Sequence, residues 1–195
     1  MNAQGYPEYT HDQTGIVFVL VPGGTFDMGS PNTESFSSSF ERPVHQVTLD
    51  SFLIAKYEVT QAQYEAVMGS NPSGFPGDDQ RPVEQVSWDD LTAADGFLDR
   101  TGLVLPSEAQ WEYATRGGTQ TGYSFGDDCN AGNCDPCSPA DDFMWWCANA
   151  RDMTQPVGQK QPNPFGLHDT HGASSGDDVQ SVGSTSSRAR HTCVG

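Results

Sequence analysis

Five cysteines are the side chains in this sequence that are best suited to chemistry, and four of them lie close together. In an exported protein, the grouping of Cys129, Cys134, Cys137 and Cys147 predicts two disulfide bonds that fix a surface loop. The spacing of two residues between Cys134 and Cys137 also suits zinc, although no second pair with this spacing is present. Free thiols are the third alternative. Cys193 stands apart, near the end of the sequence.

Two carboxylates and one histidine are further candidates for chemistry. Glu108 and Glu112 lie one helical turn apart, which would suit an acid/base pair, but neighbouring helical carboxylates favour a solvated face. His45 has no second histidine or cysteine near it in the sequence, so it is interpreted as an ordinary hydrogen-bonded histidine. Neither group predicts a catalytic centre by itself.

A His/Asp group and an acidic loop are the remaining candidates. His168, Asp169 and His171 are the closest such group in the sequence, but a spacing of three residues fixes no metal geometry. The segment 127–135 is rich in Asp and Asn and suggests a calcium loop, although it lacks the sixth-position glycine and closing Glu of an EF-hand. The sequence contains no Gly-rich phosphate loop, Gly-x-Ser-x-Gly motif or His-Glu-x-x-His motif.

Helices are predicted where Ser or Thr is followed three residues later by Gln or Asp, which is the pattern of a capping box. This pattern predicts helices that begin at 61, 88 and 108. Gly69 and Gly117 follow the first and third of these helices and predict their ends. The third helix lies in the segment 105–118, which is the most informative stretch of the chain.

Strands are predicted in the first quarter of the chain and once again near its middle. The apolar run 16–21 leads into a Pro-Gly-Gly turn, after which 26–28 is expected to return as a hairpin. The alternation in 45–49 predicts a half-buried strand that continues through 52–54. A short strand is expected at 83–86.

Large aromatic residues are expected to build the core beside these elements. Trp88 is expected to fill the core next to its helix, which is predicted to run to Leu98. Trp111 and Arg116 are expected to stack or pair within the third helix. Residues 122–142 are predicted to form a loop, and 143–168 are predicted to pack as short irregular segments.

Charge and length exclude several classes of function. The formal net charge of −17 repels phosphate backbones, so nucleic-acid binding and binding to anionic membranes are not expected. The longest apolar run has six residues, whereas a membrane span needs about 20. No signal peptide is visible at the N-terminus, whereas the cysteine group suggests an exported or periplasmic protein, so localisation stays open. We expect a monomer.

Several segments together resemble the formylglycine-generating enzyme family, whose domains are also called sulfatase-modifying factor domains. They lie in family order across residues 16–172. The segments are 18–30, Glu41-Arg42-Pro43-Val44-His45, Tyr57-Glu58-Val59-Thr60, 82–88, 105–118, Cys147-Ala148-Asn149, Pro156-Val157-Gly158 and 162–169. The signature residues of the scaffold are Pro106, Glu108, Trp111, Glu112, Arg116 and Gly117.

The resemblance implies a fold, an activity and two metals. The fold is α+β, an irregular C-type-lectin-like arrangement with little regular secondary structure. Family enzymes oxidise a sulfatase cysteine to formylglycine, using copper held by two cysteines in the C-terminal part of the domain. They also hold structural calcium, and Asn149 and Ala150 match part of one such calcium site. A lone side-chain oxygen falls short of the six to eight ligands that calcium needs.

The sequence departs from the family pattern after Gly172. The family continues with Asn-Val-Trp-Glu-Trp and a later segment that carries the catalytic cysteines, whereas this chain has a Ser/Gly-rich string with Cys193 alone. The expected organisation is an extension at 1–15, an incomplete family domain at 16–172 and a disordered tail at 173–195, with a frameshift or truncation as the hypothesis for the tail.

The expected function follows from this departure. We expect a family member without catalytic residues and without a copper site, which is a pseudoenzyme. The alternative is a lectin-like binding module that presents loops 30–40, 70–82 and 122–142 to a protein or glycan partner.

Overall fold

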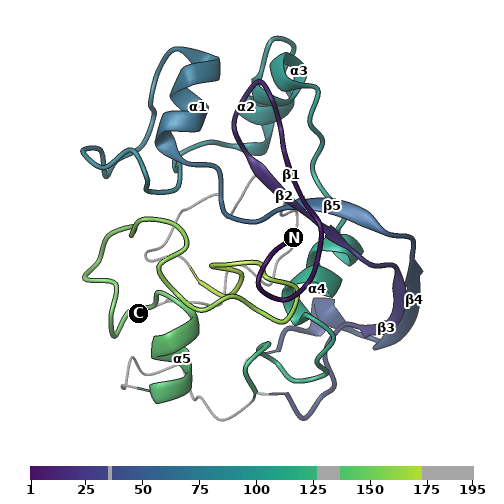
Figure 1. The fold of residues 1–195 in the computed structure, drawn as a ribbon. Helices are drawn as coiled ribbons and strands as arrows, with labels where there is room; N and C mark the ends of the chain where they lie inside the picture. The colour runs from purple at the N-terminus through teal and green to yellow at the C-terminus, as the bar shows by residue number, and fades with distance from the viewer. Residues whose placement is uncertain (35–36, 127–136, 173–195) are drawn as a thin grey trace.

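The computed structural model describes residues 1–34, 37–126 and 137–172 (Figure 1). Three sequence predictions lie outside the described residues. These are the participation of Cys129 and Cys134 in disulfide bonds, the calcium loop at 127–135 and the disordered tail at 173–195.

β2 (Val17–Val21) is the central strand of the first of two antiparallel sheets. β1 (Glu8–Thr10) pairs with one edge of β2, and β5 (Phe52–Ala55) pairs with the other. The β-branched and aromatic residues of β2 favour an extended backbone. Val19 and Val21 point to the same face of the sheet and are fully buried. The predicted strand at 16–21 is therefore confirmed.

β3 (Gly24–Met28) and β4 (His45–Leu49) form the second sheet. The predicted hairpin is wrong, because β2 and β3 belong to different sheets. The chain crosses between the sheets at Gly23, where a Cβ atom would lie 2.6 Å from the Leu49 carbonyl oxygen. The predicted continuation of the later strand through Ile54 is also wrong, because that segment is β5. β2 therefore pairs with β1 and β5 and not with β3, although β3 is the strand nearest to it in the sequence.

Side-chain caps begin the helices at the predicted positions. Thr60 caps α1 (Gln61–Met68) and Ser107 caps α4 (Glu108–Arg116), and in each helix the Gln at the third position bonds back to the cap. A glycine in the left-handed conformation follows each helix, and Gly117 has φ 60°. The local signals in the sequence therefore suffice to place both helices.

The helix predicted from 88 to 98 is instead two short helices. α2 (Trp88–Thr92) and α3 (Phe97–Thr101) are separated by a turn in which Asp95 has φ 68°. Gly96 is required in this turn, because a Cβ atom there would lie within 2.8 Å of three backbone carbonyl oxygens. The turn lets the two helices pack against each other.

Three further predictions about these elements are wrong. Trp88 is 58% exposed and does not fill the core. Residues 83–86 form no strand, because the backbone leaves the extended region at Gln85, which has φ 58°. The segment 122–142 is not all loop, since α5 (Ser138–Phe143) begins inside it with a proline in its first turn.

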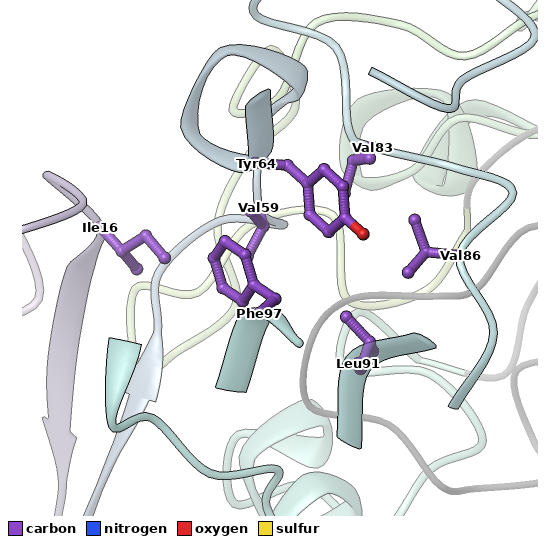
Figure 2. Close-up of a cluster of buried hydrophobic side chains, with 7 residues drawn as sticks. All are labelled: Ile16, Val59, Tyr64, Val83, Val86, Leu91 and Phe97. Carbon is purple, nitrogen blue, oxygen red and sulfur yellow. The ribbon is translucent and has the colours of Figure 1, made fainter. Parts of the chain in front are cut away.

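An apolar cluster joins the three upper helices in Figure 1 to the first sheet. Within it, the rings of Tyr64 and Phe97 stack with their centroids 5.3 Å apart. Figure 2 shows its buried members, which are Ile16, Val59, Tyr64, Val83, Val86, Leu91 and Phe97. Helices α1, α2 and α3 are therefore held to the sheet by side-chain packing.

A second apolar cluster packs α4 against both sheets and the C-terminal segment 163–167. Asn163 is buried and fixes this segment: its Nδ2 donates to the Ala114 carbonyl at 2.7 Å, and its Oδ1 accepts from the Leu167 N–H at 3.1 Å. Small sheets, short helices and much ordered coil confirm the predicted irregular α+β fold. Within the described residues, every helix is too short or too polar to cross a membrane.

Candidate functional site

A buried ion pair lies at the C-terminal end of α4. The Nε atom of Arg116 donates to Oε1 of Glu112 at 2.8 Å, and each side chain is only 5% exposed. The prediction of a solvated carboxylate face is therefore correct for Glu108, which is exposed, and wrong for Glu112. Among the described residues, Arg116 pairs with Glu112 and not with Trp111 as predicted.

This ion pair holds two loops to the helix. The Gly29 N–H donates to Oε1 of Glu112 at 2.9 Å, and Nη2 of Arg116 donates to the Gly29 carbonyl at 2.9 Å. Nη1 of Arg116 donates to the Thr121 carbonyl at 3.2 Å. Charge-assisted bonds to buried groups are stronger than neutral ones. The two residues therefore act as a clamp on the loops that follow β3 and α4.

The loop that follows β3 carries a capped turn and a solvent-exposed aromatic side chain. Ser38 and Glu41 form a complete capping box around the 3-10 helix η1 (Ser39–Glu41), and the Ser30 N–H donates to the Glu41 carbonyl at 3.1 Å. Phe40 lies on this turn and is 89% exposed. This turn was not among the predicted elements, although Ser38 followed three residues later by Glu41 is the same signal that predicts α1 and α4.

The loop that follows α4 carries an aromatic cluster, made of Tyr123, Phe125, Phe143 and His171. The Tyr123 and Phe125 rings stack at 5.0 Å, and the Phe125 and Phe143 rings stack at 5.2 Å. The His171 ring meets Tyr123 and Phe125 edge-on. Its Nε2 accepts from the Ser124 N–H at 2.9 Å, so this nitrogen carries no proton. His171 therefore positions the loop.

Electrostatics connect the two loops at this end of the molecule. Burial raises the pKa of Tyr123, and the nearby Glu34 carboxylate raises it further. Two of the three predicted binding loops, 30–40 and 122–142, thus begin beside the same Arg116 side chain and lie below α4 in their described parts (Figure 1). The third, 70–82, lies beside α1 at the other end of the molecule in Figure 1. There the Nε2 atom of Gln61 donates hydrogen bonds to the Phe75 and Pro82 carbonyls, each at 3.3 Å.

The remaining histidines do not join the aromatic cluster. Nδ1 of His168 lies 2.8 Å from the Lys160 carbonyl, and its ring packs on Tyr57. Burial lowers the pKa of His168. His45 is exposed, and its Nδ1 lies 3.0 Å from the Pro43 carbonyl. In the described parts of the chain, no three His, Cys, Asp or Glu side chains are arranged to hold a metal ion.

Asp169 is the most perturbed acid of this region. One of its oxygens, Oδ2, accepts from the Gly158 N–H at 2.6 Å, whereas Oδ1 is buried without a hydrogen-bond partner. Burial raises the pKa of Asp169 to about 6. His168, Asp169 and His171 therefore have three separate environments, although they are close in sequence.

The comparisons with known proteins decide the family. The sequence profile of the sulfatase-modifying factor enzyme 1-like domain matches residues 4–175. The chain belongs to this family. Chaperone protein LppX of Paenibacillus barcinonensis is 33% identical, over 79% of this chain and 68% of that protein. A formylglycine-generating enzyme of Streptomyces coelicolor is 30% identical, over 79% of this chain and 65% of that protein. The chain spans about two thirds of the length of these relatives.

Solved structures of similar fold agree with this assignment. PvdO from Pseudomonas aeruginosa has a TM-score of 0.68 and 25% identity, and the match covers 85% of this chain and 70% of PvdO. Treponema denticola variable protein 1 has a TM-score of 0.63 and 23% identity, covering 84% of this chain and 72% of that one. The predicted membership in the formylglycine-generating enzyme family is therefore confirmed.

The described residues do not fit the copper chemistry of this family. Cu(I) favours soft thiolate ligands, and the family's site needs two of them. Cys137 and Cys147 are the two cysteines in the described part of the chain, and both are disulfide-bonded. A disulfide sulfur offers no thiolate, so neither residue can hold copper in this state. The prediction of two disulfide bonds among the four cysteines stays a prediction, since Cys129 and Cys134 lie outside the described residues.

The oxygens predicted to bind calcium already have protein partners. Oδ1 of Asn149 accepts from the Trp146 N–H at 2.9 Å, and Nδ2 donates to Oδ1 of Asp141 at 3.1 Å. The Ala150 carbonyl accepts from Nε2 of Gln155 at 2.8 Å. These hydrogen bonds fix both oxygens without a metal ion. Calcium binding at Asn149 and Ala150 therefore stays a prediction, and the present role of Asn149 is to close a turn.

Proposed function

We propose that this chain is a family member that binds other proteins through loops below α4 and does not oxidise them. The observation that carries this proposal is the loop after β3. Its base is held by the buried Glu112–Arg116 pair, and Phe40 on its 3-10 turn is exposed to solvent. A rigid scaffold with an exposed loop is the usual arrangement of a binding module.

The cysteines support the absence of oxidase activity. Copper in this family needs two thiolates, and a cysteine in a disulfide bond offers none. Cys137 and Cys147 are disulfide-bonded. We therefore propose that the described residues of this chain hold no copper site.

The name of one relative supports a role in protein binding. The relative named Chaperone protein LppX is 33% identical to this chain, and a chaperone acts by contacting another protein. We carry only this general mode of action to the present chain. A glycan is the alternative partner, and binding of the purified chain to a panel of glycans tests this alternative.

The test of this proposal is an assay for aldehyde formation. The purified chain is loaded with copper and incubated in air with a peptide that contains Cys-x-Pro-x-Arg, and the product is analysed by mass spectrometry. The proposal predicts an unchanged cysteine and no copper retained after dialysis. Aldehyde formed in multiple turnovers would overturn it.

A further inference from the structure

We infer that the turn around Phe40 is the docking site for protein segments that combine apolar side chains with Lys or Arg. This inference rests on the proposed protein-binding function and names the surface and the chemistry of the partner. It follows from three features of the turn: its rigidity, its exposed apolar groups and its charge.

The turn is fixed before any partner arrives. The Ser38 hydroxyl accepts from the Phe40 N–H at 3.3 Å, and the Ser38 N–H donates to Oε1 of Glu41 at 3.2 Å. Nη2 of Arg42 donates to the Ser37 hydroxyl at 2.8 Å. Because the backbone around Phe40 is already ordered, a partner loses little binding free energy in ordering it.

Two apolar side chains of this segment are exposed to solvent. Phe40 has the highest exposed fraction of the large apolar side chains described, and Val44, four residues later, is 42% exposed. Single exposed apolar residues are common on protein surfaces. Phe40 differs from such residues because the capping box of Ser38 and Glu41 fixes the backbone that carries it. Phe40 is therefore the apolar contact group that this turn offers to a partner.

The charge of the chain selects the partner. The net charge is −17, and the segment that carries Phe40 includes the carboxylates of Glu34 and Glu41. Arg42 is the basic group on this segment, and its guanidinium is bonded to Ser37. An anionic segment would be repelled by the field of the whole protein, whereas a cationic one would be attracted. Lys and Arg beside apolar side chains therefore match both features.

The test uses defined peptides and fluorescence anisotropy with the full chain. The probe is a fluorescein-labelled peptide in which Leu and Arg alternate, separated by Gly and Ser. Matched peptides carry Glu in place of Arg, or Ser in place of Leu. The variants are Phe40→Ala, Phe40→Trp and, as the control, Val104→Ala. Val104 is also apolar and 82% exposed, but it precedes the opposite end of α4. Circular dichroism verifies that each variant is folded.

The expected result is binding of the Leu/Arg peptide that weakens as salt is raised. Phe40→Ala should weaken it about tenfold or more, since a buried Phe side chain is lost from the contact. Phe40→Trp and Val104→Ala should leave it within about twofold, and both matched peptides should bind more weakly. Equal binding by wild type and Phe40→Ala would overturn the Phe40 site but leave the proposed function standing. No binding of any peptide would overturn both.

Discussion

Replacing Arg116 with Met is the perturbation that most directly tests the clamp on α4. Methionine keeps most of the apolar volume of the arginine stem and removes the guanidinium. The Glu112 carboxylate then still accepts the hydrogen bond from the Gly29 N–H, but it no longer pairs with the buried guanidinium. The Gly29 and Thr121 carbonyls each lose a donor.

The size of the effect follows from the burial of the pair. Removing one partner of a buried ion pair costs about 3–5 kcal/mol, because the other charge stays buried without compensation. This is a large part of the roughly 5–15 kcal/mol by which folded domains are stable. The double variant Glu112→Gln/Arg116→Met leaves no charge, and Gln can still accept from the Gly29 N–H. We therefore expect the double variant to lose only about 1–3 kcal/mol.

Urea unfolding followed by circular dichroism measures these free energies. Glu112→Gln alone completes the double-mutant cycle. The reasoning predicts that the double variant is more stable than Arg116→Met. A loss below about 1 kcal/mol for Arg116→Met, or a double variant that loses the sum of both single variants, would refute the clamp.

Three further predictions concern the C-terminal segment and the helix ends. The folded-state pKa of Asp169, about 6, lies above its ordinary value of 3.8, so its stabilising contribution is complete below pH 3.8 and is lost as pH rises through 6. The loss is about 3 kcal/mol, and Asp169→Asn should remove it from a pH series of urea unfolding in EDTA; an unchanged slope would contradict the assignment. Gly69→Ala should cost about 1–2 kcal/mol in thermal unfolding, because alanine is disfavoured in the left-handed conformation. Gly117→Ala should cost more, because its new Cβ atom would also lie 2.6 Å from the Pro164 side chain, whereas the Cβ atom at position 69 would meet nothing within 4 Å. Asn149→Ala should cost about 1–3 kcal/mol equally in calcium and in EDTA, since the side chain closes a turn; a cost seen only with calcium would assign it to a metal site instead.

Local signals in the sequence predicted the helix ends well. A hydroxyl cap and the Gln three residues later lie within one turn, so the pairs at Thr60 and Ser107 need no tertiary information. Ser38 and Glu41 have the same spacing, so the turn that carries Phe40 is also predictable from the sequence.

Features set by distant contacts were not predicted. β2 pairs with residues 8–10 and 52–55, and no local pattern ranks these partners above the nearby 26–28. Trp88 is apolar, but the buried face of its short helix is taken by Leu91. The exposure of a side chain thus depends on what covers its helix.

The clamp shows the same limit within the candidate site. The spacing of Glu112 and Arg116 is that of an ordinary helical ion pair, which is usually solvated. Its burial comes from the loops at Gly29 and Thr121, which lie far from one another in the sequence. Sequence patterns could therefore identify the scaffold but not the role of its signature residues.

One measurement tests the central claim that this chain binds proteins without oxidising them. A fluorescein-labelled peptide carries Cys-x-Pro-x-Arg within a Leu- and Arg-rich sequence and is incubated in air with the copper-treated chain. Anisotropy reports binding, and mass spectrometry of the same sample reports the cysteine. The account predicts salt-sensitive binding that needs Phe40, with the peptide cysteine unchanged. Conversion of that cysteine to an aldehyde over multiple turnovers would contradict it.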